Sequence, residues 1–209
     1  MISRYAKIKT MENGESKNRG RGTKEKVRSF VTHTFPPLYA PDSEILILGS
    51  IPSPKSREIG FYYGHPRNRF WSVLARVLDE PVPATVDIDA KKAICLRHHI
   101  ALWDVLASCY IHGADDGSIE EPVANDIAGL ILKTGIRHIF TTGTKAYQLY
   151  RKYCEAETGI EAVRLPSTSP ANCAVKEEML LSAYGQLANV LKKKIIDGNK
   201  KLDRNTLSC

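Results

Sequence analysis

The most regular pattern of apolar and polar positions begins at residue 45. Ile45, Leu46, Ile47 and Leu48 form an unbroken apolar run that ends at Gly49. A short run without polar alternation is typical of a strand buried on both faces, as in a parallel sheet. Three further segments have the same character and are predicted to be strands: IALWDV (100–105), RHIFT (137–141) and EAVRL (161–165).

Helical periodicity fills the stretches between these strands. Apolar residues recur three and four positions apart in RFWSVLARVL (69–78), which predicts an amphipathic helix. Further helices are predicted over 89–98, 126–133, 145–154 and 176–194. Strands that alternate with helices form right-handed βαβ units. The predicted fold class is therefore α/β, a three-layer helix/sheet/helix sandwich around a roughly four-stranded parallel sheet.

Charge is distributed unevenly along the 209 residues, whose net charge is +7. Residues 1–28 carry nine Lys or Arg and three Glu, and residues 192–209 carry six Lys or Arg and two Asp, whereas the middle is slightly acidic. We predict a basic flexible leader (1–30), a folded α/β domain (31–196) and a basic flexible tail (197–209). Such tails can attract phosphates without regard to sequence, but they do not establish DNA binding.

Composition excludes several classes of protein. No apolar run approaches the roughly 20 residues that span a bilayer, and no secretory signal follows the charged N-terminus. The five cysteines are widely spaced and form no CxxC pair, so we expect reduced thiols and neither a metal site nor a cofactor. We expect a cytoplasmic protein, nucleoid-associated in a prokaryote.

Two loops that follow predicted strands carry unusual chemistry. The first runs from Gly49 to Asn68, far longer than the usual connection of about two to six residues. The second is LPSTSPAN (165–172). Ligands of open parallel sheets bind beyond the carboxyl ends of the strands, so we expect the two loops to face one cleft.

The stretch FYYGHPRNRFW (61–71) combines groups suited to a nucleotide. Tyr63 offers a flat ring on which a base can stack. Hydrogen-bond donors suited to phosphates or to a leaving base are offered by His65, Arg67 and Arg69. Asn68 cannot titrate but can orient a water molecule. The competing interpretation is that Asn68 caps the following helix. In the second loop, hydroxyls and backbone amides of Ser167, Thr168 and Ser169 can bind phosphates without charge.

The two loops together resemble those of a known family. The segments GSIPSPKSREIGFYYGHPRNRFW (49–71), LWDVLASC (102–109) and LPSTSPAN resemble the uracil-DNA glycosylase superfamily, and are most similar to its DNA-deoxyinosine (hypoxanthine) glycosylases. The resemblance extends from about Phe35 to Leu191. It implies the fold of that superfamily and hydrolysis of the N-glycosidic bond of a deaminated base to leave an abasic site, with hypoxanthine (deoxyinosine) as the expected base.

The resemblance also assigns roles to residues. Uracil-specific relatives carry polar groups at the positions of Ile51 and Leu165, and the resemblance moves catalysis to Asn68. The implied base-binding residues are Gly49, Ser50, Ile51, Tyr63 and His65, and the implied phosphate-binding residues are Arg67, Ser167, Thr168, Ser169 and Asn172. The segment YIHGADDGSI (110–119) departs from the family pattern and leaves the base preference open.

Several alternatives remain open at this level. The chain could be a uracil or mismatch-specific glycosylase, or a non-catalytic DNA-binding protein on the same scaffold. A small-molecule enzyme that holds a phosphate at Gly49–Ser50 has little support, because no GxGxxG or GxxxxGK[ST] motif occurs. We expect a monomer that acts on damaged DNA, double- or single-stranded. Lys55 is interpreted as a solvated lysine and residues 171–175 as a candidate wedge, which predicts base release without strand cleavage.

Overall fold

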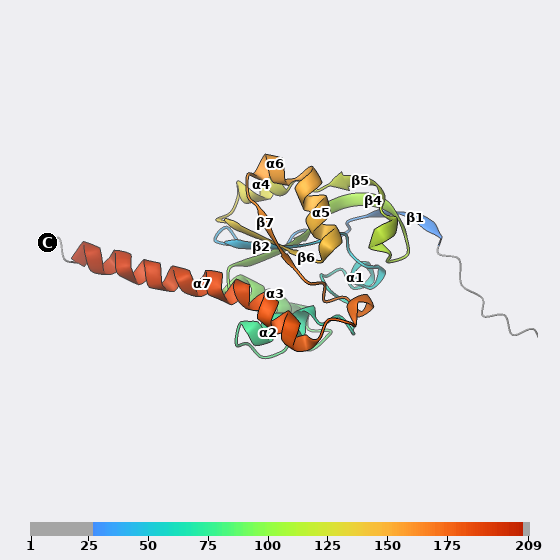
Figure 1. Cartoon of the computed structure of the whole chain (residues 1–209). Helices are drawn as coiled ribbons and strands as arrows, with labels where there is room; N and C mark the ends of the chain where they lie inside the picture. Colours follow the sequence, from blue (N-terminus) through green and yellow to red (C-terminus); the bar gives the residue numbers. More distant parts are fainter. Residues whose placement is uncertain (1–26, 207–209) are drawn as a thin grey trace, which may run out of the picture.

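The structure is a computed structural model that describes residues 27–206, with side chains described up to residue 191 (Figure 1). Its strands are β1 (Arg28–Thr32), β2 (Ile45–Gly49), β3 (Ile100–Asp104), β4 (Leu106–His112), β5 (Glu120–Ala124), β6 (His138–Thr142) and β7 (Ala162–Leu165). Its α-helices are α1 (Pro54–Ile59), α2 (Phe70–Val77), α3 (Ile88–Arg97), α4 (Ile127–Ile131), α5 (Thr144–Tyr153), α6 (Glu155–Thr158) and α7 (Glu177–Thr206). Two 3-10 turns, η1 (Asp116–Ser118) and η2 (Pro170–Asn172), complete the set.

A four-stranded parallel sheet forms the centre of the molecule, in the order β3-β2-β6-β7. All five residues of β2 are buried, as its uninterrupted apolar sequence requires for a central strand. The four strands coincide with the four predicted segments, so the predicted sheet is confirmed.

Helices cover both faces of this sheet (Figure 1). Side chains alternate between the faces of a strand, and β2 therefore contributes to two separate cores. Ile45 and Ile47 pack against α2, α3 and α7, whereas Leu46 and Leu48 pack against α4, α5 and residues of β4. This arrangement confirms the predicted helix/sheet/helix sandwich.

A second, antiparallel sheet in the order β1-β4-β5 was not predicted. Only Val105 separates β3 from β4, so the sequence suggested one short strand where the chain forms two strands in different sheets. The strand β1 starts at Arg28, and residues 28–30 therefore differ from the leader that we predicted for 1–30. Residues 1–26 lie outside the described part of the chain.

The C-terminal helix is longer than the sequence suggested. Leu180, Tyr184 and Leu187 are fully buried in the core that α2 helps to form. The helix then leaves the body of the protein and continues to Thr206, where a flexible tail from residue 197 had been expected (Figure 1).

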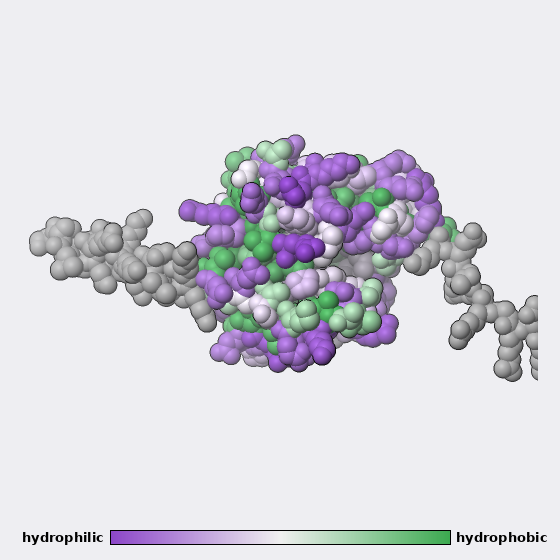
Figure 2. Space-filling view, viewed as in Figure 1, coloured by the Kyte–Doolittle hydropathy of each residue, from purple (hydrophilic) through white to green (hydrophobic). Residues whose placement is uncertain are grey.

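The surface in the same orientation is mostly polar. Hydrophilic side chains predominate around its outline, with smaller apolar areas towards the middle (Figure 2). None of the helices in the described residues has the length and apolarity needed to cross a membrane.

The carboxyl ends of the four parallel strands lie along one edge of the sheet. Register pairs Gly49 of β2 with Asp104 of β3, and Thr142 of β6 with Leu165 of β7. The two chemically unusual loops thus begin at the same edge, as the sequence predicted, and β6 lies between the strands that precede them.

Candidate active site

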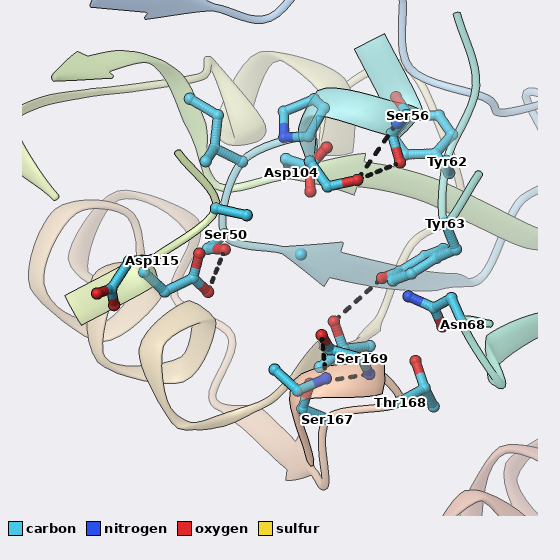
Figure 3. Close-up of a pocket in the computed structure, with 18 of the residues that line it drawn as sticks. Ser50, Ser56, Tyr62, Tyr63, Asn68, Asp104, Asp115, Ser167, Thr168 and Ser169 are labelled. Atoms are coloured by element: carbon cyan, nitrogen blue, oxygen red, sulfur yellow. Dashed lines mark hydrogen bonds between the residues drawn. The ribbon is translucent and has the colours of Figure 1, made fainter. Parts of the chain in front are cut away.

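A cavity of about 380 Å³ lies at this edge (Figure 3). This volume is within the range of small-ligand pockets. Tyr63 and Asn68 lie on one side of it, Ser50 and Asp115 on the opposite side, and residues 167–169 on a third. Nine of the eleven predicted site residues line the cavity: Gly49, Ser50, Ile51, Tyr63, Asn68, Ser167, Thr168, Ser169 and Asn172.

Tyr63 is fixed on two sides. Its ring stacks on Phe70 with centroids 3.6 Å apart, and its hydroxyl lies 3.1 Å from Oγ1 of Thr142. The backbone φ of Tyr63 is 51°, an uncommon value for a residue with a side chain and one that often accompanies functional loops. Burial raises the pKa of Tyr63 well above its usual value, so the phenol stays neutral. The result is a rigid, uncharged ring at the cavity wall.

The position of Asn68 is compatible with both interpretations that the sequence left open. Its Oδ1 accepts a hydrogen bond from the backbone N–H of Phe70 at 2.9 Å, which forms an Asx turn just before α2, whose N-cap residue is Arg69. Asn68 also lines the cavity. A carbonyl oxygen has two lone pairs, so Oδ1 can accept a second hydrogen bond while the turn holds the side chain in place.

His65 and Arg67 lie outside this cavity. They line a neighbouring depression, which shares Tyr63 and Asn68 with the cavity. Nδ1 of His65 accepts a hydrogen bond from the backbone N–H of Arg67 at 3.1 Å. The predicted contact of His65 with the base therefore has no support from its position, whereas the exposed Arg67 can still reach a phosphate beside the cavity.

Residues 167–172 form a compact turn that is held together by hydrogen bonds within the segment. Oγ of Ser167 accepts from the backbone N–H of Ser169, and Oγ of Ser169 accepts from that of Ala171. Nδ2 of Asn172 donates to the carbonyl of Ser167. Both serine hydroxyls keep their protons for donation to a ligand. Thr168 differs, because it is only 1% exposed and its side chain lies against Tyr184, which leaves little of it for the predicted phosphate contact.

Arg69 joins the two loops. Its guanidinium donates to the carbonyls of Val175 at 2.6 Å and Asn172 at 2.9 Å, and its backbone N–H donates to the carbonyl of Thr168 at 3.1 Å. The sequence had suggested a phosphate ligand here. The structure instead uses the guanidinium to satisfy backbone groups, which fixes the Asn68 loop against the Ser167 turn.

A buried acid that the sequence analysis missed also lines the cavity. Asp104 ends β3, and its Oδ2 lies 2.9 Å from Nε2 of His33, with both side chains less than a tenth exposed. Burial raises the pKa of the Asp104 carboxyl, and the hydrogen bond and charge of His33 act against this shift. The rule that placed Gly49 at the ligand edge applies equally to the end of IALWD and could have identified Asp104.

A second acid reaches the cavity from the segment that departs from the family pattern. Asp116 of η1 accepts a hydrogen bond at its Oδ2 from the hydroxyl of Ser50, at 2.8 Å. Burial raises the pKa of Asp116, the bond from Ser50 opposes this shift, and the nearby charge of Asp104 adds to it. No sequence signal placed 110–119 at the cavity, because the contact depends on how β4 and β5 fold back over the sheet.

Ile51 and Leu165 stand where the resemblance implies polar groups in uracil-specific relatives, and both are apolar and buried. Ile51 is 8% exposed and belongs to the core, although part of it reaches the cavity. Leu165 is fully buried in the opposite core. Neither residue can bind water or stabilise charge. Among residues 27–206, no three His, Cys, Asp or Glu side chains are grouped so that they could hold a metal ion.

Comparison with known proteins places this arrangement in a family. A sequence model of the uracil DNA glycosylase superfamily matches residues 36–190. The chain belongs to this superfamily.

Individual relatives agree with this assignment. The chain is 36% identical over 140 residues to a hypoxanthine DNA glycosylase of Methanosarcina acetivorans, and 33% identical over 141 residues to one of Methanosarcina barkeri. Each match covers 66% of this chain and 86% of the relative. A solution structure described as a candidate uracil DNA glycosylase from Methanosarcina acetivorans superposes with a TM-score of 0.63 at 30% identity, covering 77% of this chain and 99% of that one.

Replacing Gly49 should disturb the acid beside it. A Cβ at this position would lie 2.2 Å from Oδ1 of Asp104, and the bond to His33 prevents this carboxylate from moving freely. We expect Gly49→Ala to lower the free energy of unfolding by about 2 kcal/mol in denaturant titrations. Gly185→Ala is the control, because a Cβ there meets nothing within 4 Å and alanine favours the helix. Equal stability of the two variants would contradict this interpretation.

Removing the Arg69 side chain should separate the two loops. We expect Arg69→Ala to lower the free energy of unfolding by about 2–3 kcal/mol, because two carbonyls lose a charged donor. Arg67→Ala, two positions away and exposed, should change it by less than about 0.5 kcal/mol. Thermal and denaturant unfolding measure both variants, and similar losses would show that Arg69 has no special structural role.

Proposed function

We propose that this protein is a DNA repair glycosylase that removes deaminated bases, with hypoxanthine as the preferred base, and leaves an abasic site. One observation carries the proposal: the amide of Asn68, held by its bond to Phe70, and the rigid ring of Tyr63 line the same cavity. The names of the relatives from Methanosarcina support hypoxanthine as the base. Damaged DNA is then the partner, and we expect a cytoplasmic monomer.

The reaction requires the nucleotide to leave the duplex. Flipping costs a few kcal/mol, and less for a mispaired base. One face of Tyr63 is covered by Phe70, so the flipped base would stack on the face or edge that borders the cavity. Gly49 brings the backbone close to this ring, and the hydroxyl of Ser50 lies across the cavity from it.

Asn68 would act on the sugar. The hydrogen bond from Phe70 holds the Asn68 amide in place, and the second lone pair of Oδ1 would accept a hydrogen bond from the attacking water. The same carbonyl dipole would favour the positive charge that develops on the deoxyribose as the base leaves. A neutral group suffices for this step if the leaving base is stabilised by hydrogen bonds.

The phosphates beside the flipped nucleotide would meet the second loop and Arg67. The hydroxyls of Ser167 and Ser169 and the backbone of their turn offer neutral donors, whereas Arg67 adds charge next to the cavity. Residues 171–175 would supply the wedge that fills the vacated stack. We expect Arg67→Ala to weaken binding in a salt-dependent manner without loss of base preference.

A panel of lesions tests the proposed function directly. We expect the protein, with a chelator present, to release hypoxanthine from deoxyinosine oligonucleotides faster than uracil or xanthine from matched strands. Strand breaks should appear only after alkali, because no covalent lyase step is involved. Lesion binding on gels without any abasic sites would instead indicate a non-catalytic binding protein, and preferential uracil release would favour the uracil-specific alternative.

Two substitutions of Asn68 separate its catalytic role from its structural role in the turn. A serine hydroxyl can form the same local turn with the N–H of Phe70 but lacks the amide, so Asn68→Ser should retain most of the stability and lose base release by about 100-fold or more. Asn68→Ala should lose both, with a stability loss of about 1 kcal/mol. Single-turnover rates and melting temperatures measure these effects. Full activity of Asn68→Ser would leave Asn68 with the structural role alone.

A further inference from the structure

Asp116 lines the cavity, and a hydrogen bond from the hydroxyl of Ser50 sets the orientation of its carboxylate. Ser50 follows β2 directly, and its Oγ donates to Oδ2 of Asp116, 66 positions further along the chain. The bond uses Oδ2, so Oδ1 is the oxygen that can accept from a ligand. Burial raises the pKa of Asp116 and donation from Ser50 opposes this shift; in its ionised form the carboxylate only accepts hydrogen bonds.

The other two acids nearby are engaged differently. Oδ2 of Asp104 is paired with His33, and its Oδ1 is packed against Gly49. Asp115 uses Oδ1 to accept from the backbone N–H of Gly117 and thereby shapes the turn. Asp116 differs from both, because Ser50 holds its Oδ2 at the cavity wall and leaves Oδ1 for a ligand.

Deamination changes the group that such a carboxylate would meet. In adenine the ring nitrogen N1 is an acceptor, and in cytosine the same is true of N3. When the neighbouring amine is replaced by a carbonyl, this nitrogen gains a proton, so hypoxanthine and uracil each present a ring N–H donor where adenine and cytosine present an acceptor. Enzymes that flip bases read this Watson–Crick edge by hydrogen bonds.

We propose that Asp116, oriented by Ser50, accepts a hydrogen bond from the ring N–H that deamination creates, and thereby selects deaminated bases against adenine and cytosine. The inference rests on the proposed function and names the specificity-determining residue for it. Adenine or cytosine would bring a lone pair against the carboxylate and leave a buried acceptor unpaired, which sites of this kind reject strongly.

The substitution Asp116→Asn tests this assignment. The hydroxyl of Ser50 would hold the amide carbonyl, as it now holds Oδ2, and the amide NH₂ would then face the base as a donor. We expect the single-turnover rate on deoxyinosine to fall by about 10- to 100-fold, and the ratio of hypoxanthine to adenine release to fall with it. Asp126→Asn is the matched control, because Asp126 is an exposed helix cap outside the cavity and asparagine caps equally well. Its rate should stay within about twofold of the parent protein.

A modified substrate keeps the proposal testable if Asp116→Asn does not fold. Oligonucleotides with 1-methyldeoxyinosine lack the N1 proton but keep the carbonyl, and the parent protein should process them at least about 10-fold more slowly than deoxyinosine. Unchanged rates on this substrate, or a folded Asp116→Asn variant with the parent's rate and base preference, would overturn the role of Asp116. If the parent protein releases no base from any lesion, it is the proposed function that fails instead.

Discussion

The site depends on one constraint, the fixed distance between two loops that leave different strands of the same sheet. Parallel register brings the ends of β2 and β7 to one edge, with β6 between them. Arg69 then donates to three backbone carbonyls, those of Thr168, Asn172 and Val175, through its backbone N–H and its guanidinium. Because Asn68 precedes Arg69 directly, this clamp also sets where the amide stands relative to the Ser167 turn. A flexible version of either loop could not hold catalytic groups within the tolerance that catalysis requires.

The polar groups around the cavity differ in the free energy that it costs to bury them. Tyr63 and Asn68 are neutral and need only hydrogen bonds to be buried. Asp104 and Asp116 are acids in a partly desolvated site, and burial raises the pKa of both. Each has a specific partner, His33 or Ser50, that offsets part of this penalty. Acids retained under these conditions are typical of functional sites, which is consistent with a role in reading the base.

The exchange of polar for apolar residues at 51 and 165 also has a structural meaning. Both side chains now complete the cores on the two sides of the sheet. The groups able to orient water or accept a hydrogen bond from a base lie instead just before α2 and on the turn after β4. The cavity therefore keeps the position that the fold provides, while the residues around it supply a different set of hydrogen bonds.

Local sequence determined the central sheet, most helices and the two loops, because a buried strand, an amphipathic helix and a long loop each leave a pattern within about ten residues. It also identified Asn68, Tyr63 and Ser167, which lie in loops adjacent to strand ends. Tertiary structure alone decided that Arg69 is a clamp, that His33 pairs with Asp104, and that Asp116 reaches Ser50. These contacts join residues 66 to 106 positions apart, and no local pattern specifies them, since each depends on how the second sheet and the final loop pack against the first.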